Sequence, residues 1–228
     1  MTEQAPFEDF GAAEFADNPE PRCPCVLILD TSSSMSGEPI RELNDGLATY
    51  REELMEDGLA AKRVEVALIT FGGEAKVVHD FATAESFFAP TLKPSGHTPM
   101  GEAVSRGLDL LEQRKGEYKA NGVAYYRPWV FLITDGAPTD DWEQAADRSR
   151  SEDAENRYMM FSVGVEGADF KVLSRFSNRE PLRLKGLRFR ELFAWLSSSQ
   201  KQVSQSNPGD RVPLEDPTAG PKGWAAVV

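Results

Sequence analysis

The sequence predicts an α/β protein with a central, mostly parallel sheet, one antiparallel edge strand, and helices on both faces. Two short runs, residues 25–29 and 129–133, are continuously apolar, and a carboxylate closely follows each. Continuous rather than alternating hydrophobicity is typical of strands buried on both faces. Segments with helical spacing of apolar residues lie between the strand segments, and this alternation is typical of an open parallel sheet.

The composition indicates one folded, acidic domain. The chain has 228 residues, 40% of them hydrophobic, which is enough for a buried core. Acidic residues outnumber basic residues by 37 to 25, and the formal net charge is -12. Because this charge repels phosphate backbones and anionic lipids, we expect neither nucleic acid nor membrane as a partner. A cation or a basic partner fits better.

The N-terminal third predicts an arm, a strand and a helix. Residues 1–21 are acidic and aperiodic, which predicts a flexible arm. After the strand at residues 25–29, Ser36 or Gly37 caps a helix that Gly58 ends. The buried face of this helix is predicted to consist of Ile40, Leu43, Leu47, Tyr50 and Leu54.

A hairpin and a second long helix follow. Strands at residues 64–71 and 75–81 flank Gly72 and Gly73, so they should pair antiparallel. The second helix begins after Pro99. Its buried face is predicted to contain Met100, Ala103, Val104, Leu108 and Leu111.

The second half continues the alternation and ends in a proline-rich tail. The predicted elements are a strand at 129–134, a helix at 141–155, a strand at 158–165, a short helix at 170–176, a strand near Leu182 and a last helix from Phe189 to about Val203. The domain should therefore span residues 22–205, followed by a tail at 206–228 with no helix. We expect Trp224 to dock into an apolar groove, on this domain or on a partner, with its ring nitrogen hydrogen-bonded.

Cysteine usage and the N-terminal segment predict a cytoplasmic protein. Cys23 and Cys25 are the only two cysteines, and their spacing strains a mutual disulfide, so a reducing compartment is the simple interpretation. Because no further Cys or His stands at zinc spacing, we expect both thiols to pack in the core. Residues 1–21 lack the apolar segment of a signal peptide, and residues 129–133 are too few to span a bilayer.

Oxygen-bearing side chains follow the predicted strand ends and suggest a metal site. Asp30, Ser32 and Ser34 alternate along one turn, so their side chains should converge. Thr98 adds a hydroxyl from another loop, and Asp135 adds a second carboxylate after the strand at 129–134. Two carboxylates with three hydroxyls suit a hard cation, and the sparse cage favours Mg²⁺. Taken singly, the serines could instead form hydroxyl turns, and Asp135 could cap a helix.

These five residues resemble the metal-ion-dependent adhesion site (MIDAS) of the von Willebrand factor A (VWA) family. The Asp-x-Ser-x-Ser motif, the loop Thr and the strand-end Asp match in type and order, and the resemblance covers roughly residues 23–205. It implies a Rossmann-like VWA fold and a non-enzymatic protein-interaction module. It also implies a divalent metal, Mg²⁺ with Mn²⁺ or Ca²⁺ as alternatives, that takes a carboxylate from a protein partner as its next ligand.

Within that family, the sequence resembles the bacterial tellurium-resistance (TerY-like) subgroup. Residues 30–37 (Asp-Thr-Ser-Ser-Ser-Met-Ser-Gly), residues 134–139 (Thr-Asp-Gly-Ala-Pro-Thr), the chain size and the tail with Gly223 and Trp224 carry this resemblance. It implies a role in tellurite or stress-response signalling beside a Ser/Thr kinase and a PP2C-type phosphatase.

A metal-dependent phosphatase or phosphotransferase is the alternative hypothesis. Asp30 ends its strand much as the nucleophile of a haloacid dehalogenase does. Those enzymes place a second acid two residues later to protonate the leaving group, and here that position is Ser32, which is no acid near neutral pH. The sequence therefore favours binding over catalysis.

Overall fold

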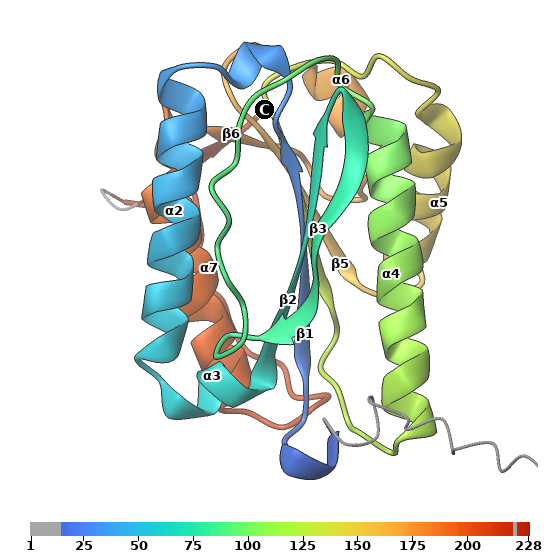
Figure 1. The fold of residues 1–228 in the computed structure, drawn as a ribbon, viewed down its shortest axis with the longest axis vertical. Helices are drawn as coiled ribbons and strands as arrows, with labels where there is room; N and C mark the ends of the chain where they lie inside the picture. The colour runs from blue at the N-terminus through green and yellow to red at the C-terminus, as the bar shows by residue number, and fades with distance from the viewer. Residues whose placement is uncertain (1–14, 221–222) are drawn as a thin grey trace, which may run out of the picture.

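The architecture is built on one seven-stranded sheet with the strand order β3-β2-β1-β4-β5-β6-β7. The computed structural model describes residues 15–220 and 223–228 (Figure 1). The strands are β1 (Cys23–Asp30), β2 (Val64–Gly72), β3 (Glu74–Thr83), β4 (Trp129–Thr134), β5 (Met159–Gly164), β6 (Leu182–Leu184) and β7 (Ala225–Val227). The five central strands, β2, β1, β4, β5 and β6, pair in parallel. The two edge strands, β3 and β7, pair antiparallel to their neighbours.

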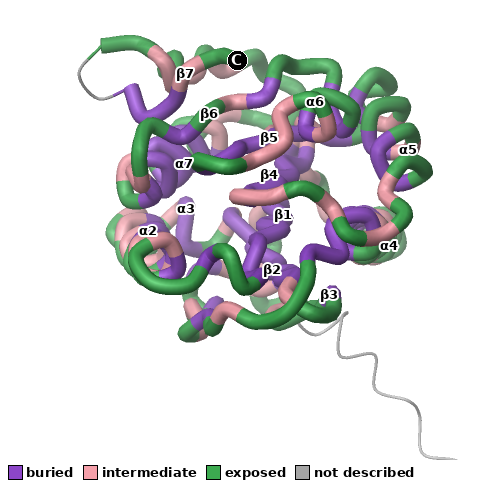
Figure 2. The backbone as a smooth tube through the Cα atoms, turned by 90° about the horizontal axis from the view of Figure 1, so that it is seen from above, coloured by how far each residue is buried: buried purple, intermediate pink, exposed green. Residues whose placement is uncertain are grey.

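Helices cover both faces of this sheet, as predicted. They are the 3₁₀ turn η1 (Ser33–Met35), α2 (Glu38–Met55), α3 (Gly58–Arg63), α4 (Met100–Ala120), α5 (Glu143–Ala154), α6 (Phe170–Leu173) and α7 (Phe189–Ser204). Figures 1 and 2 show α2, α3 and α7 on one side of the sheet and α4, α5 and α6 on the other. A hydrophobic core lies on each face of the sheet, and alternate residues of β1 belong to one core or the other. Leu27 and Leu29 pack toward α2 and α7, whereas Val26 and Ile28 pack toward α4.

The continuously apolar strands are buried on both faces. All eight residues of β1 and all six of β4 are buried. Cys23 and Cys25 are free thiols inside the core, which confirms the packing role predicted for them. Burial raises the pKa of Cys25 to about 12. This thiol therefore stays protonated near neutral pH and is neither a metal ligand nor a nucleophile.

Two details differ from the sequence-based expectation. A second antiparallel edge strand, β7, joins the sheet beside the predicted one, β3. The first long helix ends at Met55, and Gly58 does not stop it but begins the next helix, α3. The side chain of Asp57 caps α3 by accepting hydrogen bonds from the amides of Leu59 and Ala60.

Residues 15–21, the described part of the predicted flexible arm, pack against the domain. Phe15 is only 5% exposed, and the guanidinium groups of Arg22 and Arg114 lie 5.4 and 4.8 Å from its ring centroid. Both guanidiniums also pair with the fully buried carboxylate of Glu65 at 2.8 Å. The arm prediction is therefore wrong for residues 15–21, and residues 1–14 lie outside the described part of the chain.

The proline-rich tail folds back onto the domain. Trp224 is 1% exposed and lies 5.7 Å from the ring of Trp195 on α7, so docking on this domain is confirmed. The predicted hydrogen bond is wrong, because the buried ring nitrogen of Trp224 has no partner among the described residues. No helix in residues 15–220 and 223–228 has both the length and the apolar character needed to cross a bilayer.

Candidate metal site

The sheet topology places the candidate site between β1 and β4. β1 pairs with β2 on one side and with β4 on the other, so the strand order reverses at β1. Ligands of open α/β sheets bind beyond the carboxyl ends of the strands at such a reversal. Asp30 is the last residue of β1, and Asp135 directly follows β4. The two predicted carboxylates therefore come from adjacent strand ends.

The carboxylate of Asp30 is buried and held by two hydrogen bonds. Its Oδ1 accepts from the backbone amide of Ser32 at 2.7 Å, and its Oδ2 accepts from the hydroxyl of Thr134 at 2.5 Å. The residue has no exposed surface. Both oxygens thus have fixed directions at the end of β1.

Ser32, Ser34 and Asp135 form a continuous chain of polar contacts. The hydroxyls of Ser32 and Ser34 lie 2.9 Å apart, and the Ser34 hydroxyl donates to Asp135 Oδ1 at 2.7 Å. Ser32 is buried, Ser34 is exposed and Asp135 is half-buried. Ser32 and Ser34, two of the three side chains predicted to converge, therefore lie together and reach Asp135 through Ser34, and this chain of contacts opens toward solvent on the Ser34 side.

Thr98 lies in the loop before α4 and contacts the segment that follows Asp135. Its backbone amide donates to the hydroxyl of Thr139 at 3.0 Å, and its carbonyl accepts from the amide of Thr139 at 3.0 Å. The Thr98 hydroxyl lies 4.0 Å from the point where a Cβ on Gly136 would stand, and it makes no hydrogen bond with any described residue. The neighbouring His97 is exposed, and no hydrogen bond of its imidazole to the described residues is present.

Close backbone packing fixes the loops that carry these side chains. The amide of Ser33 donates to the carbonyl of Gly96 at 3.1 Å, and that of Ser95 donates to the carbonyl of Thr31 at 2.7 Å. A Cβ on Gly72 would stand 2.2 Å from the carbonyl oxygen of Thr31, so only glycine fits there. The serine turn and the Thr98 loop are therefore held as one unit.

Three supporting residues were not predicted from the sequence. Thr134 orients Asp30, Thr139 holds the backbone of Thr98, and Asp140 accepts hydrogen bonds from the amides of Gly101 and Glu102 at 3.1 and 2.8 Å. Asp140 thereby caps α4 from a distant segment. All three lie in one polar segment of the sequence, residues 134–140, which was the available signal for them. The contacts that they make, however, depend on the tertiary fold.

The electrostatics of the cluster favour a bound cation. Burial raises the pKa of Asp30, and the charge of Asp135 raises it further, against the hydrogen bonds from Thr134 and Ser32. Burial likewise raises the pKa of Asp135 above its ordinary value. Neither carboxylate forms an ion pair with a Lys, Arg or His in the described part of the chain. Two like charges are thus held close together without a protein cation between them.

The donor set fits a hard divalent ion. Carboxylate and hydroxyl oxygens are the ligands that Mg²⁺, Mn²⁺ and Ca²⁺ prefer, and Mg²⁺ commonly keeps water in its shell. In residues 15–220 and 223–228, no group of three or more His, Cys, Asp or Glu side chains could hold a metal. The cluster differs from such a group because three of its five donors, Ser32, Ser34 and Thr98, are hydroxyls.

Comparison with known proteins assigns the family. The family model of the von Willebrand factor type A domain matches residues 25–189, which is most of the chain. The chain belongs to the von Willebrand factor type A domain family. The matched VWA segment begins in β1 and ends at the start of α7, so it includes every residue of the candidate site.

Relatives of the VWA domain here are distant. The minor fimbrium subunit Mfa5 of Porphyromonas gingivalis is 22% identical over 125 residues, which are 51% of this chain and 9% of that protein. The structure of the ArnB paralog VWA2 from Sulfolobus acidocaldarius has 16% identity and a TM-score of 0.51, covering 78% of this chain and 45% of that one.

A further solved structure carries a metal. Proximal thread matrix protein 1 of the mussel byssus, solved with a zinc-occupied MIDAS motif, has 15% identity and a TM-score of 0.53. The match covers 79% of this chain and 48% of that one. This chain thus spans less than half the length of both solved relatives and a small part of the curated one. At these identities the structural likeness shows the VWA fold.

Proposed function

We propose that this VWA domain is a non-enzymatic, metal-dependent protein–protein interaction module. The single observation that carries the proposal is the cluster of Asp30, Ser32, Ser34 and Asp135 at the carboxyl ends of β1 and β4, with the Thr98 hydroxyl near Gly136. A structurally similar protein, proximal thread matrix protein 1 of the mussel byssus, has a zinc-occupied MIDAS motif, and this supports a divalent metal in the VWA domain here. We propose Mg²⁺ as the resident ion, with Mn²⁺ or Ca²⁺ as substitutes.

The composition of the site suits the capture of a partner carboxylate. Two carboxylates only balance a divalent charge, and the hydroxyls of Ser32, Ser34 and Thr98 are neutral. A bound metal would therefore remain electrophilic and accept an acidic side chain of a partner as a further ligand. The exposed position of Ser34 leaves a path from solvent to that ligand position.

The cellular setting is a finer proposal that rests on the resemblance to TerY-like proteins. We propose a cytoplasmic role in bacterial tellurite or stress-response signalling, with a Ser/Thr kinase and a PP2C-type phosphatase as partners. The acidic composition of the chain supports a protein partner rather than nucleic acid or membrane.

A pull-down from the native organism tests this proposal. The full chain should capture its partners in Mg²⁺, and EDTA or the variant Asp135→Asn should release them. Asp141→Asn is the matched control, because Asp141 is exposed and its carboxylate makes no hydrogen bond with the described residues. Equal capture with and without EDTA would refute metal dependence. Turnover of a phosphate ester that needs Mg²⁺ and Asp30 would instead support the phosphatase alternative.

A further inference from the structure

Four exposed carboxylates stand around the candidate metal site without a counter-ion. None of them forms a hydrogen bond or an ion pair with a residue that the structure describes; they are Glu38, Asp141, Glu143 and Glu166. Figure 1 shows the segments that carry them, the start of α2, the β4–α5 connection and the β5–α6 loop, together at the upper end of the molecule. We call these four residues the acidic rim.

Backbone contacts bring two residues of the acidic rim next to the candidate ligands. Gly167 directly follows Glu166, and a Cβ on Gly167 would stand 2.9 Å from the carbonyl oxygen of Asp135. Glu38 comes four residues after Ser34, and four residues span at most about 14 Å. Glu38 and Glu166 are therefore close neighbours of the hydrogen bond between Ser34 and Asp135.

The other two rim residues follow the segment that holds Thr98. The amide of Thr139 donates to the carbonyl of Thr98 at 3.0 Å, and Asp141 comes two residues later. A Cβ on Gly101 would stand 2.7 Å from the carbonyl oxygen of Asp141. Asp141 and Glu143 line one pocket of about 330 Å³. The acidic rim thus continues on the Thr98 side of the site.

Thr98 points independently to a ligand position inside the acidic rim. The residue is only 7% exposed, yet its hydroxyl makes no hydrogen bond within the described part of the chain. This hydroxyl lies 4.0 Å from the point where a Cβ on Gly136 would stand, and Gly136 directly follows Asp135. Because a buried hydroxyl gains free energy from a hydrogen bond or a metal, a ligand beside Thr98 would satisfy it.

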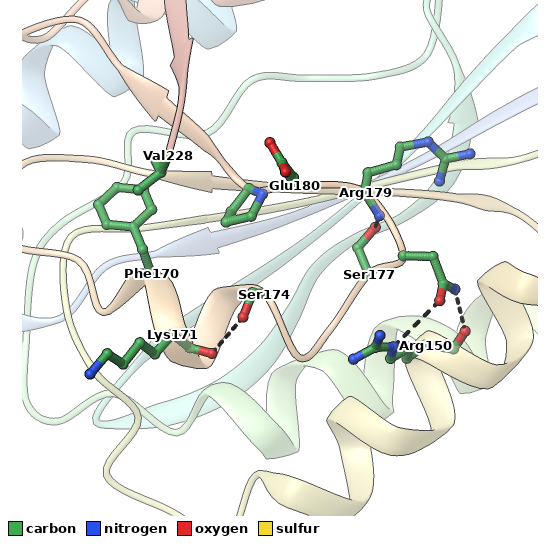
Figure 3. Close-up of a pocket in the computed structure, with 10 residues that line it drawn as sticks. Arg150, Phe170, Lys171, Ser174, Ser177, Arg179, Glu180 and Val228 are labelled. Atoms are coloured by element: carbon green, nitrogen blue, oxygen red, sulfur yellow. Dashed lines mark hydrogen bonds between the residues drawn. The ribbon is translucent and has the colours of Figure 1, made fainter.

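Cationic side chains of neighbouring elements do not pair with the acidic rim. Arg41 on α2 is exposed and forms no ion pair with a described carboxylate. A pocket of about 420 Å³ beside α6 has three cations in its lining: Arg150, Lys171 and Arg179. Arg179 pairs with Asp153 at 2.7 Å. The Lys171 amine is directed away from Arg150, so these cations do not converge (Figure 3).

The charge balance of the site decides which partner fits. The carboxylates of Asp30 and Asp135 only balance one divalent ion, so the acidic rim leaves four negative charges around a bound metal. Two unit charges 10 Å apart in water change an affinity by about twofold, and many such pairs add up at low salt. The acidic rim therefore repels a purely acidic segment and attracts cations that stand beside the ligating carboxylate.

We propose that the partner segment presents its metal-binding carboxylate between basic residues, which pair with the acidic rim. The inference rests on the proposed function, because it specifies the partner of the same metal site: one Asp or Glu for the ion, with Lys or Arg on both sides. The attraction is shared among four charges. Neutralising a single one, as in Asp141→Asn, changes the affinity by no more than about twofold at physiological salt.

Three peptides that differ only in their flanking charge test this inference. Acetyl-Lys-Ala-Asp-Ala-Lys-amide is compared with forms that carry Gln or Glu in place of both Lys. Titration of the ¹⁵N-labelled full chain in saturating Mg²⁺ and low salt should rank the affinities in the order Lys, Gln, Glu. Successive peptides should differ by about threefold or more. The differences should shrink in 1 M NaCl, where the Debye length is about 3 Å.

A triple variant of the acidic rim should remove this ranking. In Glu38→Gln/Glu143→Gln/Glu166→Gln, the three affinities in saturating Mg²⁺ should come within about twofold of one another. Glu38 and Glu143 also stand in the first turns of α2 and α5, where a carboxylate stabilises the helix. Circular dichroism therefore checks that the variant is folded before its affinities are compared.

A matched control removes the same charge elsewhere. Glu52→Gln/Glu85→Gln/Glu155→Gln neutralises three exposed carboxylates that pair with no described residue, and it should keep the wild-type ranking. Glu52 and Glu155 lie near the far ends of α2 and α5, roughly 20 Å along each helix from Glu38 and Glu143. A loss of ranking in this control would mean that net charge alone selects the peptide, which would overturn the inference.

The peptides also separate this inference from the proposed function. Equal, Mg²⁺-dependent binding of all three at low salt would overturn the basic partner and leave the proposed function intact. Undiminished binding of the Lys peptide in EDTA, or after its Asp is replaced by Asn, would overturn the inference as well, because the acidic rim would then bind cations without the metal. Absence of Mg²⁺-dependent binding for every peptide would contradict the proposed function and the inference that rests on it.

Discussion

Thr134 donates its hydroxyl hydrogen to the carboxylate of Asp30, a residue 104 positions earlier, with an oxygen–oxygen distance of 2.5 Å. The two residues end neighbouring parallel strands, β4 and β1. The same Thr134 oxygen accepts a hydrogen bond from the amide of Gly136 at 3.1 Å. Thr134 therefore couples the direction of the Asp30 carboxylate to the loop that carries Asp135.

Replacement of Thr134 should weaken the metal site without removing a ligand. Thr134→Val keeps the shape of the side chain but leaves Asp30 Oδ2 without its donor, and we expect Mg²⁺ affinity to fall by about 10–100-fold. Thr134→Ser restores the hydroxyl and should recover most of the affinity. Isothermal titration calorimetry measures both. Wild-type affinity in Thr134→Val would show that Asp30 needs no such positioning.

The candidate ligands were predictable from the sequence, whereas their supports were not. Asp30, Ser32 and Ser34 lie in one short motif, and parallel strands bring their ends to one edge of the sheet, so Asp135 could be added. The contacts of Thr134 and Asp140 depend on strand register and on the path of a loop. The sequence pattern does not specify either.

The packing of the two ends of the chain was likewise only partly predictable from the sequence. Phe15 stands in an acidic, aperiodic segment, and its burial depends on Arg22, Glu65 and Arg114, which come from three separate parts of the chain. The burial of Trp224 was predictable because a large indole gains free energy out of water. Whether its ring nitrogen finds a hydrogen-bond acceptor was not predictable, because an acceptor atom must then lie at one particular position in the packed interior.

Removal of a charged ligand should damage the site more than removal of a neutral one. Asp30→Ala should abolish Mg²⁺ binding, while Thr98→Ala should weaken it less, because water can replace a hydroxyl in the shell. Calorimetric titrations of the two variants give the comparison, and far-UV circular dichroism checks that each is folded. A larger loss in Thr98→Ala than in Asp30→Ala would reverse this ranking.

Bound metal should stabilise the native domain through mass action. At a Mg²⁺ concentration ten times the dissociation constant, the gain is about 1.4 kcal/mol, which corresponds to a Tm increase of roughly 3–5 °C for a chain of this size. Differential scanning calorimetry of protein stripped with EDTA, with and without added Mg²⁺, measures the shift. The increase should disappear in Asp30→Ala. Identical melting of stripped and Mg²⁺-loaded wild type would contradict metal binding by the folded state.

Asp153 should contribute a pH-dependent part of the stability. Burial acts to raise the pKa of this carboxyl, but hydrogen bonds from Arg179 and the Asn178 amide outweigh burial and hold it below its ordinary value of 3.8. Because the folded-state pKa is the lower one, this stabilisation is present above pH 3.8 and is lost as the pH falls through the folded-state pKa.

The variant Asp153→Asn tests this contribution. Its free energy of unfolding should fall by about 1–3 kcal/mol at neutral pH, because buried donors lose their acceptor. The deficit should shrink as the pH is lowered below about 4. Urea unfolding across this pH range gives the values. Asp147→Asn, on the same helix but in an exposed pair with Arg175, should change little. A constant deficit at every pH would assign the loss to packing alone.

Trp224 and Trp195 should respond differently to the loss of the indole nitrogen. Both rings are buried, 5.7 Å apart, but Trp195 Nε1 donates to the Glu215 carbonyl at 2.8 Å, whereas Trp224 Nε1 has no partner among the described residues. A buried donor without an acceptor costs about 1–3 kcal/mol. Trp224→Phe removes that cost along with some packing, so it should destabilise the domain less than Trp195→Phe does.

Trp224→Ala should cost about 3–5 kcal/mol, because it leaves a cavity beneath the tail. Urea unfolding followed by circular dichroism ranks the three variants. A Trp224→Phe loss equal to or larger than that of Trp195→Phe would mean that the Trp224 nitrogen finds an acceptor in solution, such as a buried water.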